Sequence, residues 1–156
     1  MAFGTSSKVF VATIEDVMEQ TALFDFNTHS FKVALYGNSG TPSQTAASAD
    51  TAYNVGAWIT ANELYDGAEW AQAGQVLDSP TFVAATNVIT FDAADETSVG
   101  TSASMANIYG VLIYDDTLAA PVADQGVCYL YTGDTTVTNG TLTVKFNASG
   151  IFTITL

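Results

Sequence analysis

The last fifty residues of the chain show the clearest hydrophobic patterning. The segments 141–147 and 151–156 both place an apolar residue at every second position, with Thr, Lys or Asn between. Such alternation is typical of a β-strand that buries one face. The segments 106–114 and 126–131 are apolar runs with almost no charge. The pattern therefore predicts four β-strands at the end of the chain.

Further strands are predicted upstream. Segment 31–36 is apolar and is followed by the turn formers of 37–42. Segments 81–84 and 87–91 have the spacing of a hairpin around Ala85-Thr86, and a helical turn is expected within 50–60. With eight or nine strands and no strand–helix–strand alternation, the chain is predicted to be all-β, an antiparallel β-sandwich of jelly-roll or Greek-key type.

Residues 6–20 are the best helix candidate. Phe10, Ile14, Val17 and Met18 fall on one helical stripe, and Ser7 is placed to cap the first turn. The β-branched run 9–14 favours a strand instead, so both alternatives stay open. We expect residues 1–24 to form an N-terminal arm or helix and residues 25–156 to form a single β-sandwich domain.

Charge restricts the partners. The chain has sixteen acidic residues but only three lysines, Lys8, Lys32 and Lys145, and no arginine, which gives a net charge of −13. Because phosphates are bound through Lys and Arg, neither nucleic acid nor an anionic membrane is an expected partner. Charged residues make up only 12% of the chain, so much of the polar surface consists of neutral side chains, which suits contact with other protein.

Residues that could carry chemistry are few. Cys128, the only cysteine, lies in an apolar segment, which indicates an inert buried thiol. His29, the only histidine, precedes a strand within a turn and has no second histidine with which to hold zinc. No phosphate-binding glycine loop is present. We expect no cofactor, no metal and no catalytic residue.

Three alternatives involve carboxylates or aromatic rings: a calcium site, a glycosidase and a sugar-binding platform. Ca²⁺ prefers oxygen ligands, which acidic loops supply. The spacing of the acidic residues in two loops of this chain matches no EF-hand, and solvated loop acids are the simpler interpretation. A carboxylate pair would also suit a glycosidase, and the Trp and Tyr rings would suit a sugar platform. The acids concerned are Asp92, Asp95 and Glu96 in one loop, and Asp115, Asp116 and Asp124 around another.

Several segments resemble a group of small structural proteins of tailed bacteriophages. The resemblance begins with Phe31-Lys-Val-Ala-Leu-Tyr36, which runs into a Thr-Pro loop. It continues through residues 60–63, 106–116 and 121–126, and the closing 140–152 looks like the final hairpin of that group. It covers most of residues 24–156 in the same order and departs from the group in the first twenty residues and in the acidic loops. It implies a virion protein, made in the host cytoplasm, and transfers no catalytic residue.

The sequence therefore leads to a functional hypothesis. The chain is expected to be a capsid cement or decoration protein on the capsid surface, which bridges subunits of the major capsid protein and associates with itself as a dimer or trimer. Alternatives are a minor tail or neck protein, a carbohydrate-binding virion module and, last, an enzyme. Candidate contacts include the loop 37–50 and five apolar residues: Phe3, Phe10, Ile14, Trp58 and Trp70.

Overall fold

A computed structural model describes residues 3–156 of the chain. Strands account for 39% of the residues and helices for 10%, and the sheets are antiparallel, so the predicted all-β sandwich class is confirmed. No helix in the described range is long and apolar enough to cross a membrane.

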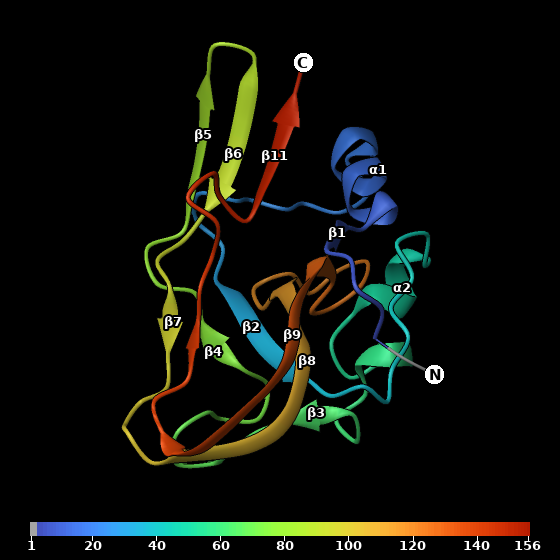
Figure 1. Cartoon of the computed structure of the whole chain (residues 1–156). Helices are drawn as coiled ribbons and strands as arrows, with labels where there is room; N and C mark the ends of the chain where they lie inside the picture. Colours follow the sequence, from blue (N-terminus) through green and yellow to red (C-terminus); the bar gives the residue numbers. More distant parts are fainter. Residues whose placement is uncertain (1–2) are drawn as a thin grey trace.

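The main sheet has six strands in the order β1-β9-β8-β2-β3, with β4 also paired to β2. The long hairpin of β8 and β9 forms its centre, and its register shifts several times along β8 (Figure 1). The bounds are β1 (Lys8–Val9), β2 (Phe31–Tyr36), β3 (Glu63–Leu64), β4 (Gln75–Val76), β8 (Ala103–Asp115) and β9 (Gly126–Gly140).

Two smaller sheets complete the strands. A three-stranded sheet in the order β11-β6-β5 projects from one end of the molecule (Figure 1), and β10 and β7 form a two-stranded sheet. Their bounds are β5 (Thr81–Ala85), β6 (Val88–Asp92), β7 (Glu96–Thr97), β10 (Thr143–Val144) and β11 (Phe152–Thr155). The predicted hairpin is confirmed with its turn one residue later, at Thr86-Asn87, where Thr86 adopts a left-handed φ of 56°.

The main sheet is covered on both faces. One face carries the larger apolar cluster, which includes Val33, Val111 and Phe91 and packs against the smaller sheets. The other face carries Tyr36 and Leu112 and is covered by the N-terminal segment and by the helical turns α2 (Ser48–Thr51) and η1 (Gly56–Trp58). The helical turn expected within 50–60 is therefore present, in two short pieces.

The N-terminal segment contains both of the predicted alternatives. Lys8 and Val9 pair with β9 as strand β1, and the helix α1 (Val11–Glu19) follows at once. Ser7 does not cap the helix, because its hydroxyl accepts a hydrogen bond from Tyr131 N at 3.0 Å. The segment thus continues the main sheet at its edge, while the division of the chain at residue 24 stays a prediction.

The closing hairpin expected from the resemblance is wrong. β10 pairs with β7, and β11 pairs with β6, so the two alternating segments never meet. Between them the chain turns at Asn147–Gly150, where Gly150 N donates to Asn147 O at 2.7 Å and Gly150 has a φ of 99°. This turn directs the last strand to the projecting sheet, which only the tertiary structure reveals.

Candidate functional site

An open apolar groove of about 510 Å³ lies between α1 and the projecting sheet. We call it the α1 groove. Helix α1 and the loop that follows it form one wall, and strands β5 and β11 form the other. Its lining residues are Ile14, Val17, Leu23, Phe24, Asp25, Phe26, Asn27, His29, Phe82, Phe152 and Ile154.

The groove exists because α1 packs against the body through its polar side. Ala12 and Thr13 are the buried residues of the helix, and Thr13 Oγ1 donates to Gly126 O at 2.6 Å. Asp16 accepts hydrogen bonds from Ser48 Oγ at 2.6 Å and Gln125 Nε2 at 2.7 Å. With these contacts directed inward, Ile14 and Val17 line the groove and Met18 is exposed to solvent.

The hydrogen bonds to Asp16 have an electrostatic consequence. Partial burial acts to raise the pKa of its carboxyl, but donors on Ser48, Gln125 and Thr21 outweigh burial and hold the pKa below its usual range. Asp16 is therefore ionised when it fixes the helix to the body.

Aromatic stacking builds the floor of the groove. Phe26 stacks on Phe82 with ring centroids 4.9 Å apart, on Phe31 at 5.4 Å and on Phe24 at 5.9 Å. Phe26 also meets Phe91 edge-on at 5.1 Å. These rings connect the exposed groove to the main apolar cluster.

His29 lies at the end of the groove. Its Nδ1 is 2.6 Å from Oδ2 of Asp115, a fully buried carboxylate whose other oxygen accepts from the backbone N–H groups of Thr117 and Leu118. Within residues 3–156 no hydroxyl or thiol is hydrogen-bonded to the His29 ring, so this pair lacks a nucleophile. Its evident effect is to fix the turn before β2 to the end of β8.

Cys128 is fully buried in β9. Burial raises the pKa of its thiol well above the usual range, which keeps the thiol protonated. The buried, unreactive state predicted for this cysteine is therefore what the structure contains.

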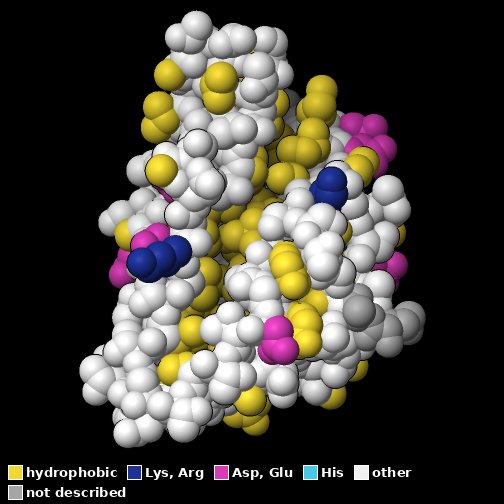
Figure 2. All heavy atoms as spheres, viewed as in Figure 1, with side chains coloured by type: hydrophobic (Ala, Val, Ile, Leu, Met, Phe, Trp, Pro, Cys, Tyr) yellow, Lys and Arg dark blue, Asp and Glu magenta, His cyan; other side chains and the backbone are white. Residues whose placement is uncertain are grey.

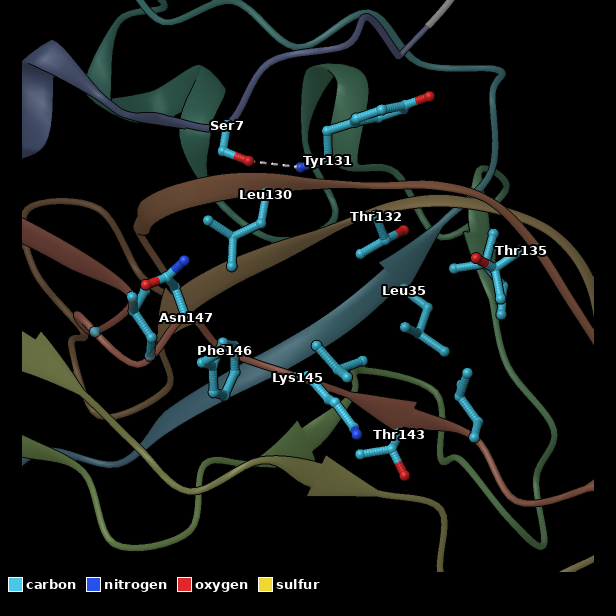
Figure 3. A pocket seen from close by; sticks show the side chains of 15 residues that line it. Ser7, Leu35, Leu130, Tyr131, Thr132, Thr135, Thr143, Lys145, Phe146 and Asn147 are labelled. Atoms are coloured by element: carbon cyan, nitrogen blue, oxygen red, sulfur yellow. Dashed lines mark hydrogen bonds between the residues drawn. The ribbon is translucent and has the colours of Figure 1, made fainter.

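A second hollow, the central cleft, has a volume of about 570 Å³ and lies between β9 and the segment around β10. Leu130, Leu35 and Phe146 come from three separate segments and point into it (Figure 3). Figure 2 shows apolar side chains in a hollow down the middle of this face, with basic side chains on both sides. Lys145 is among the residues that line the cleft.

The acidic loops do not form a cation site. Within the described part of the chain, no three His, Cys, Asp or Glu side chains gather closely enough to hold a metal ion. Glu96 is buried and accepts from Asp78 N, while Asp95 accepts from Phe146 N at 2.9 Å. Around the other loop, Asp116 pairs with Lys32 at 2.9 Å. These acids serve separate structural contacts.

Other buried carboxylates fix loops to the sheet in the same way. Glu69 accepts from Gly100 N and Ser102 Oγ, both at 2.6 Å. Glu63 accepts from Tyr53 Oη and Ala73 N, both at 2.7 Å. Burial outweighs these donors and raises the pKa of Glu63. No pair of carboxylates faces across either of the two hollows described above.

The predicted contact residues divide sharply. Phe3, Phe10, Trp58 and Trp70 are at most 3% exposed and lie in the core, so their side chains present no surface to a partner. Phe10 and Trp58 meet edge-on with centroids 6.0 Å apart, which is core packing. Of the five, Ile14 alone lines the α1 groove.

Sequence reasoning missed most of the groove. Leu23, Phe24 and Phe26 stand at the predicted domain boundary, and three large apolar residues within four positions shortly after the helix are the sequence signal that could find them. Phe82 and Ile154 looked like ordinary strand residues. The loop 37–50 does not line the groove.

Comparison with known proteins identifies no relative: no family model, no curated protein and no solved structure matches the chain.

Proposed function

We propose that this chain is a structural protein of a tailed-bacteriophage particle, specifically a capsid cement or decoration protein that bridges major capsid subunits. The observation that carries the assembly role is the α1 groove, an open apolar surface lined by exposed side chains such as Leu23. The phage setting comes from the resemblance of residues 24–156 to small virion proteins.

The mode of action is mechanical. A cement protein adds association energy across subunit boundaries, and a stable contact of this kind buries about 800 Å² on each partner. Large apolar groups that leave water on docking provide that energy. Self-association as a dimer or trimer at local symmetry axes remains part of the proposal, since repeated lattice sites favour closed symmetry.

The buried carboxylates support a structural role over an enzymatic one. Glu63, Glu69, Glu96 and Asp115 each accept hydrogen bonds from backbone or side-chain donors of neighbouring loops. Such groups hold the loops of the sandwich in place. A protein under mechanical load benefits from loops fixed in this way.

Two alternative functions, a tail or neck protein and a carbohydrate-binding module, make different demands on the structure. A minor tail or neck protein would use the same groove, and only its location in the particle would differ. A carbohydrate-binding module would need rings exposed side by side, but Trp58 and Trp70 are 2% and 0% exposed. That leaves the sugar platform without its two largest rings.

The test is a cryo-electron reconstruction of the particle that carries this chain. Copies across capsomer boundaries over the whole lattice would support the cement role. Copies confined to the tail or neck would replace it with the alternative, and absence from the particle would refute any virion role.

A functional measurement complements the reconstruction. Particles lacking the chain are expected to release DNA at a lower temperature, and purified chain added back should restore the original release temperature. If particles with and without the chain release DNA at the same temperature, the chain does not strengthen the shell.

A further inference from the structure

We infer that the chain forms a two-fold symmetric dimer through strand β5, which pairs antiparallel with β5 of a second copy. The inference deepens the proposed function and rests on the self-association that is part of it. It adds the surface and the register of that contact.

Strand β5 is a free edge of the projecting sheet. In the order β11-β6-β5 it pairs with β6, and its second edge has no partner strand within residues 3–156. Figure 1 shows β5 on the outer side of the sheet that projects from the body of the molecule. Its register with β6 is one-to-one over its whole length, and Val83 at its centre is 55% exposed. A regular, exposed edge of this kind is a template for pairing with another chain.

The hydrogen-bonding groups on this free edge belong to Phe82 and Ala84. Leu156 N donates to Asn87 O, so the odd-numbered positions from Asn87 along β6 direct their backbone groups toward β11. The even-numbered positions of β6 then bond to β5, and the register gives them the odd-numbered residues of β5 as partners. The N–H and C=O groups of Phe82 and Ala84 therefore point out of the sheet.

The charge distribution favours a second copy as the occupant of this edge. No residue from 79 to 90 is charged, in a chain whose net charge is −13. Edge strands that avoid self-pairing usually carry lysine, proline or a bulge, and residues 81–85 have none of these. Asp92 lies beside Thr81 at the end of the hairpin, away from Val83. Two acidic molecules can therefore meet along β5 itself without placing carboxylates opposite each other, whereas a basic partner would find no charge on this strand.

Two-fold symmetry fixes the register of the contact. Outward-facing groups bond to outward-facing groups, so Phe82 pairs with the partner's Ala84 and Ala84 with the partner's Phe82. Val83 then lies opposite the partner's Val83 at a non-hydrogen-bonded position, where side chains of opposite strands come closest. The contact closes after two copies, because the same strand is used on both sides.

The contact is short, so the dimer is expected to be weak in free solution. Five strand residues span about 17 Å, which places the interface at the small end of specific contacts. We expect a Kd on the order of 100 μM. Sedimentation equilibrium of the purified full-length chain, from about 10 μM to about 1 mM, measures it.

Charge variants at the symmetry axis test the register. Val83→Lys and Val83→Glu each place like charges opposite each other, and each should weaken self-association about tenfold. An equimolar mixture of the two variants should associate at least as tightly as the wild type, because opposite charges then meet across the axis. Circular dichroism verifies that each variant is folded.

A matched pair of proline variants tests the edge. Ala84→Pro removes an outward N–H that would bond the partner's Phe82, and should abolish the dimer. Thr153→Pro makes the same kind of change at an outward position of β11, the opposite edge of the same sheet, and should leave the dimer unchanged.

Three outcomes would overturn the inference: a monomer at every concentration, a mixture of charge variants that associates no better than either variant alone, or a dimer that survives Ala84→Pro. Growth of open polymers would also overturn it, since β5 would then pair with a different edge of the next copy. These failures are separate from failure of the proposed function. A chain that dimerises through β5 but is absent from the particle refutes only the virion role, and a monomeric chain found across capsomer boundaries refutes only the dimer.

Discussion

At the residue scale, the fold depends on a few positions where the backbone or a buried charge tolerates little change. Gly74 has a φ of 80°, and a Cβ there would collide with the carbonyl of Val33 in the neighbouring strand. Both features require glycine, because other residues rarely adopt a positive φ and because no room is left for a side chain. A Cβ at Gly67, seven residues earlier, would point into open space with nothing within 4 Å.

Replacing Gly74 should therefore lower the free energy of unfolding far more than replacing Gly67. We expect Gly74→Ala to lower the free energy of unfolding by about 2–4 kcal/mol, because it combines left-handed strain with overlap against β2. Gly67→Ala should stay within about 0.5 kcal/mol of the wild type. Urea unfolding followed by circular dichroism measures both, and equal losses would show that the approach to β2 is not tight.

The buried Glu63 predicts a pH dependence. Burial raises the pKa of Glu63 in the folded chain above its unfolded value. A group of this kind stabilises the fold fully below its unfolded pKa, and that contribution is lost as pH rises through the folded pKa. Acidification from pH 7 toward pH 5 should thus raise the contribution of Glu63 to stability.

Glu63→Gln isolates this contribution. The amide keeps the side-chain size and retains partners for Ala73 N and the Tyr53 hydroxyl, but it cannot titrate. The urea midpoint should rise when the pH is lowered from 7 to 5, and this rise should be smaller in the variant than in the wild type. An identical pH dependence in the two proteins would mean that Glu63 titrates alike in the folded and unfolded chains.

At the scale of elements, the edge strand β11 illustrates how pairing assigns a role to each residue. Leu156 N donates to Asn87 O at 2.8 Å, and the register pairs Ile154 with Ile89. Because bonded pairs alternate along an antiparallel ladder, Ile154 directs its N–H toward β6 and Thr153 directs its N–H outward.

Proline at these two neighbouring positions should therefore have different effects. Ile154→Pro removes a ladder hydrogen bond, whereas Thr153→Pro removes a donor that faces away from β6. We expect Ile154→Pro to be the less stable by about 1–3 kcal/mol in thermal unfolding. Ile154→Ala corrects for the lost side chain, and equal effects of the two prolines would contradict the deduced bonding pattern.

At the scale of the whole molecule, the N-terminal segment is part of the fold. Phe3 is 3% exposed and meets Trp58 at 5.9 Å and Tyr129 at 6.2 Å, both edge-on. Phe3 N also donates to Asn38 Oδ1 at 2.7 Å. Phe3 thus fastens the N-terminal segment across the face of the main sheet that carries Tyr36 and Leu112.

Truncating this ring should destabilise the entire domain. Phe3→Ala is expected to lower the free energy of unfolding by about 2–4 kcal/mol, because it leaves a cavity between two aromatic rings. Leu23→Ala is the matched control: it also lies in the first 24 residues but is 73% exposed, so its cost should be below about 0.5 kcal/mol. Comparable losses for the two variants, measured by chemical unfolding, would contradict this assignment.

The all-β class of the fold follows from local patterning along the amino-acid sequence. Alternation in 151–156 and the apolar runs that became β8 and β9 are local signals, since the period of two follows from strand geometry alone. The low number of lysines and the presence of a single cysteine in an apolar segment are likewise visible in the sequence. The N-terminal segment gave signals for both helix and strand, and the structure contains both.

Strand pairing, the buried side of α1 and the burial of the aromatic rings depend on contacts between distant parts of the chain, which local patterning does not contain. Alternation gives a strand two faces but not a partner, so it does not reveal that β10 pairs with β7 and β11 with β6. Exposure depends on what covers a residue from elsewhere in the chain. Trp58 is therefore buried, and Leu23 and Met18, equally apolar, lie open to solvent beside the α1 groove.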